Sequence, residues 1–91
     1  MSLILQNIKS NHLRRYRQKR SLRQRDIAYL VGSKTKDINR WERGIRIPNL
    51  RNALKLSAAL NCPVEVIFFD YFSKMRKEIY QRKQGLKINQ I

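Results

Sequence analysis

The stretch QRDIAYLVGSKTKDINRWER, residues 24–43, determines how the rest of the chain is interpreted. Ile27, Leu30 and Val31 are spaced i, i+3 and i+4, which places three apolar side chains on one face of a helix. Gly32 follows directly, where a positive φ is expected, because only glycine adopts that conformation without steric cost. The stretch therefore predicts two short helices joined by a glycine turn.

A small residue in the first helix and two apolar residues in the second predict how they pack. A second helix crossing closely over the first leaves room for no more than a methyl group, and Ala28 supplies one. Ile38 and Trp41 repeat the helical apolar spacing. Four polar residues lie off that apolar face and are free to touch another molecule: Thr35, Lys36, Asn39 and Arg40.

These positions, with the sequence that follows them, resemble a known family. The signature residues are Ala28, Gly32, Ile38 and Trp41, followed by Glu42-Arg43-Gly44, Arg46 and Pro48 in the pattern E-x-G-x-x-x-P. From Leu13 to Phe69 the chain is similar to the lambda-repressor-like family of phage repressors, Cro proteins and XRE regulators. The resemblance implies a sequence-specific transcriptional regulator that binds double-stranded DNA through a helix-turn-helix.

Composition limits the other classes of protein. The 91 residues allow one small domain, and the single Cys62 excludes an internal disulfide and fits a reducing cytoplasm. No apolar run approaches the roughly 20 residues that a membrane helix requires, and the first residues lack the pattern of a signal peptide. We expect a cytoplasmic protein, and the resemblance implies a bacterial or phage-encoded one associated with the nucleoid.

The net charge of +15 is concentrated over the predicted helix-turn-helix. Residues 9–55 hold fifteen of the 21 basic side chains and three of the six acidic ones. A basic excess of this kind is the electrostatic footprint of a nucleic-acid-binding protein. A solvated basic surface, or a contact with an anionic membrane, is the alternative interpretation.

The chain order predicts an all-α, five-helix domain with an amphipathic C-terminal helical extension. Residues 1–10 form a lead that is either flexible or an edge strand, residues 11–70 the DNA-binding domain, and residues 71–91 the extension. The extension is expected to be helical to about residue 84, where Gly85 would end it. The last residues, LKINQI, alternate as an edge strand would.

Capping residues predict where the other helices begin. Ser10 or Asn11 can cap a first helix whose Leu13 and Tyr16 face inward. Asn49 can cap a later core helix with a broad apolar face, formed by Leu50, Ala53, Leu54, Leu56, Ala58 and Leu60. In the C-terminal helix, apolar residues continue at helical spacing and could pack on the domain itself or form a dimer seam. We favour a homodimer through Phe68, Phe72, Met75 and Ile79.

The family resemblance also implies particular contacts. Arg17 matches the arginine that pairs with the glutamate of E-x-G, here Glu42, so we expect a partly buried salt bridge. The recognition helix would span about residues 35–43, with Thr35, Lys36, Asn39 and Arg40 at the base edges. Phosphate contacts are expected from Arg23, Gln24, Lys34, Arg43, Arg46 and Arg51. A homodimer on a two-fold site would read half-sites about 34 Å apart.

Two positions depart from the family pattern. Arg23 and Lys34 stand where most members carry a Ser or Thr helix cap, so each helix loses a cap and gains a cation at its positive end. Ser21 and Ser33 could cap instead with a shifted start. A bound phosphate would relieve the repulsion at these ends, so we expect duplex DNA to raise thermal stability.

The residue inventory argues against enzymatic and metal chemistry. One His, one Cys and six scattered acids offer no nucleophile with a base, no metal cluster and no cofactor site, and no small-molecule ligand is evident. Two rival functions remain open. One is an antitoxin-like or coactivator-like protein-interaction module, in which the C-terminal helix would bind a partner protein. The other is a non-specific basic nucleic-acid-binding protein. The mixed Thr/Lys/Asn/Arg face favours base readout over mere neutralisation of the backbone.

Overall fold

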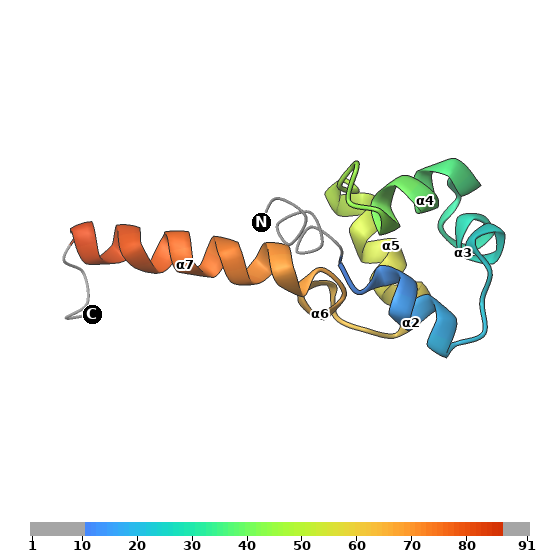
Figure 1. Cartoon of the computed structure of the whole chain (residues 1–91), viewed down its shortest axis with the longest axis horizontal. Helices are drawn as coiled ribbons and strands as arrows, with labels where there is room; N and C mark the ends of the chain where they lie inside the picture. Colours follow the sequence, from blue (N-terminus) through green and yellow to red (C-terminus); the bar gives the residue numbers. More distant parts are fainter. Residues whose placement is uncertain (1–10, 87–91) are drawn as a thin grey trace, which may run out of the picture.

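The computed structural model describes residues 11–86, which contain helices and no strand. The six helices are α2 (Leu13–Lys19), α3 (Gln24–Val31), α4 (Thr35–Glu42), α5 (Leu50–Leu60), α6 (Val64–Ile67) and α7 (Phe69–Leu86). Helices α2 to α6 form a body, and α7 extends away from it as a single long helix (Figure 1). The prediction of an all-α domain with a C-terminal helix is confirmed.

Local chemistry sets several helix ends. Asn49 precedes α5, and its Oδ1 accepts a hydrogen bond from the Asn52 N–H at 2.8 Å. The Oδ1 of Asn11 accepts from the N–H of Leu13 at 2.9 Å, although the cap position of α2 is His12, one residue after Asn11. Gly32 ends α3 with a φ of +70°, which an L side chain rarely adopts. Asn49 and Gly32 therefore lie at the helix ends predicted from sequence, whereas the start of α2 is one residue later than a cap at Asn11 predicts.

The core lies where α3 packs against α4 and α5, with α2 against α4. Ala28 is buried at the predicted crossing of α3 and α4. Cys62 is a buried free thiol, as expected for a small apolar residue. Seven side chains are fully buried: Leu13, Ile27, Val31, Ile38, Leu56, Leu60 and Ile67. All five helices of the body contribute to this core.

Several predicted core positions face solvent instead. In α3, Leu30 is 53% exposed, and the buried residues are Ile27, Ala28 and Val31. In α5, only Ala53, Leu56 and Leu60 are buried, so the part of the broad face formed by Leu50, Leu54 and Ala58 is exposed. Both helices are apolar over an arc wider than one neighbour can cover. Periodicity cannot say which part of such an arc the neighbour will cover.

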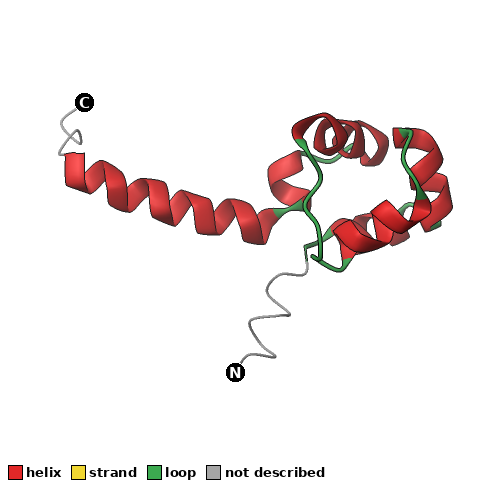
Figure 2. Cartoon of the chain, turned by 90° about the horizontal axis from the view of Figure 1, so that it is seen from above, coloured by secondary structure: helices red, strands yellow, loops and turns green. Residues whose placement is uncertain are grey.

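The C-terminal helix differs from its prediction at both ends. Phe68 is buried in the core just before α7 begins, so it cannot belong to an exposed dimer face. Gly85 lies inside α7, which continues to Leu86, so the predicted stop at Gly85 is wrong. The predicted strands within residues 1–10 and 87–91 lie outside the described residues. Figure 2 shows α7 projecting from the body in a second view.

Candidate nucleic-acid interface

Helix α4 has one buried face and one open face. Ile38, Trp41 and Glu42 are buried against the body. Thr35, Lys36 and Arg40 are exposed and Asn39 is half-buried, so all four residues of the predicted base-reading face reach solvent. With α3, this helix lies at the end of the body opposite α7 (Figure 1). The open face thus projects away from the rest of the molecule.

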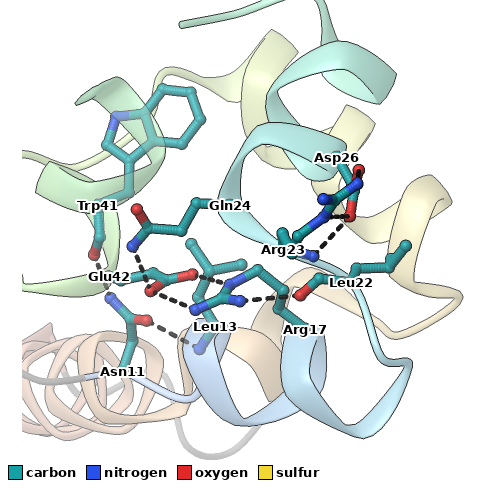
Figure 3. Close-up of polar contacts among 9 residues, drawn as sticks. All are labelled: Asn11, Leu13, Arg17, Leu22, Arg23, Gln24, Asp26, Trp41 and Glu42. Atoms are coloured by element: carbon teal, nitrogen blue, oxygen red, sulfur yellow. Dashed lines mark hydrogen bonds and ion pairs between the residues drawn. The ribbon is translucent and has the colours of Figure 1, made fainter. Parts of the chain in front are cut away.

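A buried ion pair holds the end of α4 to α2. The Arg17 Nε donates to Glu42 Oε2, and Nη2 donates to Oε1 at 3.1 Å (Figure 3). Both residues are buried, and Arg17 also donates from Nη1 to the Leu22 carbonyl oxygen at 2.8 Å. The pair expected between Arg17 and Glu42 is therefore present, and more deeply buried than expected. Its geometry fixes the end of α4 on the body.

Gln24, expected to contact phosphate, belongs to the same network. Its Nε2 donates to Glu42 Oε1 at 3.0 Å, and the side chain is half-buried at the start of α3. An amide NH₂ has two protons, so one hydrogen bond to Glu42 leaves one donor for another acceptor. The interaction with Glu42 was not predicted from sequence, because the two residues are eighteen positions apart and meet only through the packing of α3 on α4.

The two unusual cap positions keep the expected helix starts. Helix α3 begins after Arg23 and α4 after Lys34, so neither Ser21 nor Ser33 caps a shifted helix. In each helix, the aspartate at the third helical position accepts a hydrogen bond from the backbone N–H of the cap residue. Arg23 N–H donates to Asp26 Oδ2 at 2.7 Å, and Lys34 N–H donates to the Asp37 carboxylate at 3.4 Å. As predicted, Arg23 and Lys34 stand at the cap positions and neither makes a side-chain cap hydrogen bond, but each helix start also carries a carboxylate that offsets the cation.

The Arg23 side chain binds Asp26 as well. Its Nε and Nη2 each lie 3.1 Å from a carboxylate oxygen of Asp26. The hydrogen bond from the Arg23 side chain, reinforced by the bond from its backbone, lowers the pKa of Asp26. The same side-chain bond raises the pKa of Arg23. Arg23 thus has an acidic partner on an exposed surface, and a phosphate would have to share or replace it.

The other residues predicted to hold phosphate are all exposed: Lys34, Arg43, Arg46 and Arg51. Arg43 Nη1 makes a long contact of 3.5 Å with Asn39 Oδ1, which links one predicted phosphate ligand to one predicted base reader. Arg40 and Arg46 line a shared polar hollow with Asp37 and Asn49. Arg43 and Arg46 therefore lie beside the outward face of α4.

Asn11 is a structural residue whose main role the sequence did not reveal. It is buried, and its Nδ2 donates to the Trp41 carbonyl oxygen at 2.8 Å near the end of α4. Asn11 also hydrogen-bonds Tyr71, whose pKa is raised by burial and lowered to a smaller extent by that bond. Its position before Leu13 signalled a helix cap, but the contacts with α4 and α7 depend on the tertiary fold.

A protein-family model described as "Helix-turn-helix" matches residues 13–67. The chain belongs to this family. The matched segment runs from the first residue of α2 to the last residue of α6, so it coincides with the helical body. It supports the lambda-repressor-like, XRE-type resemblance seen in the sequence. No curated protein sequence matches the chain.

The helix-turn-helix family is a family of DNA-binding regulators, and it is not typically enzymatic. In residues 11–86, no group of three or more His, Cys, Asp or Glu side chains is placed to hold a metal ion. None of the helices in this range is both long and apolar enough to cross a membrane. The family match supports a DNA-binding helix-turn-helix regulator in general, and the outward face of α4 is the candidate site for that function.

Proposed function

We propose that this protein is a sequence-specific transcriptional regulator that binds double-stranded DNA as a homodimer, with α4 in the major groove. The observation that carries the proposal is the division of α4 into two faces. Its apolar residues and Glu42 hold it on the body, while Thr35, Lys36, Asn39 and Arg40 remain accessible. A rigidly held helix with a polar open face is suited to reading base edges.

The open face carries the chemistry of base recognition. Arginine can donate two hydrogen bonds to O6 and N7 of guanine, and lysine can donate to the same atoms. Asparagine pairs with the N6 and N7 edge of adenine, and the threonine methyl group can contact that of thymine. Arg40 and Lys36 would therefore select guanine, and Asn39 adenine. A surface used only for backbone neutralisation would need no such mixture.

Phosphate contacts would come from residues around this face. Gln24 has a second amide proton available while it donates to Glu42. It can therefore support the recognition helix and bind a phosphate of the DNA backbone at the same time. Arg43, Arg46 and Arg51 are exposed. Lys34 and Arg23 lie at helix N-termini, where backbone N–H groups favour an anion. These contacts position the protein without specifying sequence.

The homodimer would form through the exposed apolar residues of α7, namely Phe72, Met75 and Ile79. A two-fold protein on a palindromic site reads two half-sites about one duplex turn, roughly 34 Å, apart. The body would then contact the DNA, and α7 would form the dimer.

Selection of bound fragments from a genomic DNA library tests this function. The selected fragment and a scrambled copy of it would be compared over a range of salt concentrations. We expect the selected fragment to be a palindrome and to bind about 10³-fold or more tightly than its scrambled copy. The binding constant should fall with salt concentration with a slope equivalent to several released counterions. Equal binding of both fragments would support the non-specific alternative. Binding to neither would favour a protein-interaction module.

A further inference from the structure

We propose that α7 pairs with α7 of a second copy as a parallel, in-register two-stranded coiled coil. This inference rests on the proposed homodimer and specifies its geometry. The seam would consist of Phe72, Met75, Ile79 and Leu86, with Arg82 at the remaining seam position. The following observations concern the exposure, spacing and charge of this helix.

The apolar stripe of α7 is largely exposed among the described residues. No residue of α7 is buried, although the helix is 18 residues long. Phe72, Met75, Ile79 and Leu86 are 40 to 70% exposed. Their separations of three, four and seven residues match the two alternating steps of a heptad repeat, which keeps one stripe facing a partner helix. An exposed apolar stripe of this kind, interrupted here only at Arg82, marks an interaction surface.

The stripe continues onto the body. Phe72 and Met75 also line an open apolar groove of about 520 Å³, whose other walls include Ile47, Leu50 and Val64. Ile47 and Leu50 are themselves exposed. The exposed apolar surface thus runs from the start of α5 along α7 to Ile79, and Arg82 separates it from Leu86. A second copy seated on α7 would cover the seam and approach the mouth of this groove.

Charge determines the orientation. With Phe72 and Ile79 at position a, and Met75 and Arg82 at position d, Glu78 falls at g and Lys83 at e. In a parallel pair, a g residue faces the e residue five positions later on the other helix. Glu78 of each copy would then face Lys83 of the other, which forms two ion pairs of opposite charge. The pairing is symmetric, as a two-fold interface requires.

An antiparallel pair would place like charges together. Reversing one helix brings g beside g and e beside e, so Glu78 would face Glu78 and Arg76 would face Arg76 when the seam residues are aligned. Arg82 disfavours close packing in either orientation. Its long side chain can direct the guanidinium to solvent, four residues after Glu78 on the same helix. The flanking charges therefore favour the parallel orientation.

The parallel orientation also suits DNA binding. It places both bodies at the same end of the paired helices. Because α3 and α4 lie at the end of the body opposite α7, both recognition helices could then face one duplex (Figure 1). An antiparallel pair would instead hold the bodies at opposite ends of a helix about 27 Å long. The paired α7 helices would lie along the two-fold axis and point away from the DNA.

Disulfide cross-linking tests the orientation directly. In a full-length Cys62→Ala background, Ile79→Cys places one cysteine at the seam of each copy. Two such cysteines face each other in the parallel pair, so mild oxidation should yield a covalent dimer. Lys77→Cys, on the opposite face of α7, is the matched control and should remain largely monomeric. In an antiparallel pair Ile79 faces Met75, so cross-linking only in a mixture of Ile79→Cys and Met75→Cys proteins would overturn the proposal.

A charge exchange provides a second measurement that does not alter the seam. Glu78→Lys and Lys83→Glu should each weaken dimerisation about tenfold in sedimentation experiments, because both ion pairs become repulsive. The double variant should recover the wild-type affinity. If the double variant dimerises as weakly as the single variants, the parallel register is overturned. Two protected half-sites on DNA, without Ile79→Cys cross-linking, would reject this seam but leave sequence-specific DNA binding by a dimer standing.

Discussion

The body of the protein and α7 are both helical, but they are stable for different reasons. Helices α3 and α4 have eight residues each, too few to form alone in water, and each buries three side chains. Helix α7 has 18 residues and buries none. The longest helix thus contributes least to the core. Packing maintains the short helices, whereas α7 depends on local propensity and, we propose, on a second copy.

The largest expected effect tests the ion pair that ties α4 to the body. Glu42→Ala leaves the buried Arg17 guanidinium without its carboxylate and removes the acceptor of Gln24, so it should cost about 3 to 5 kcal/mol of unfolding free energy. The exposed Glu78→Ala in α7 is the matched control and should change the stability of the body little. Urea denaturation measures both. Equal losses would show that the two regions are not energetically distinct.

A pair of isoleucines compares the two regions with the same side chain. Ile27 is fully buried and Ile79 is 51% exposed. Ile27→Ala should cost about 2 to 5 kcal/mol, from lost transfer free energy and the cavity that remains. Ile79→Ala should change monomer stability by less than about 0.5 kcal/mol. Measured at increasing protein concentration, the stability of wild type should rise more than that of Ile79→Ala, because only the dimer buries this residue.

A pair of arginines compares the two regions in DNA binding. Arg40→Ala should reduce discrimination between the selected site and a site changed at one guanine by about 1 to 3 kcal/mol, because a bidentate contact is lost. Arg76→Ala in α7 should leave that discrimination unchanged. Competition binding to the two duplexes gives the result. A uniform loss of affinity for all sequences in Arg40→Ala would make Arg40 a phosphate contact.

The smallest expected effect concerns local capping in the body. Asn49→Ala removes the acceptor of the Asn52 N–H and should cost about 1 kcal/mol. Asn49→Asp preserves an acceptor and serves as the matched control. Thermal unfolding distinguishes the two variants. A loss in the aspartate variant equal to that in the alanine variant would assign the role of Asn49 to the polar hollow that it lines, not to the cap.

Sequence patterns predicted the parts of the site that depend on local spacing. Gly32, Ala28 and Asn49 have the predicted positions because a turn, a crossing and a cap each depend on neighbouring residues. The pair between Arg17 and Glu42 followed from a family resemblance. The interaction of Gln24 with Glu42 had no comparable signal. The base-reading residues remain predictions, although the structure places all of them on one accessible face.

By itself, the sequence determined the helix-turn-helix, its basic charge and the presence of a long C-terminal helix, since these follow from periodicity, turn chemistry and composition. Only the tertiary structure decided which part of each apolar arc is buried. It exposed Leu30 and Leu54, buried Phe68, and joined Asn11 to both Trp41 and Tyr71. The physical reason is that burial depends on the neighbour that reaches a face, and that neighbour comes from a distant part of the chain.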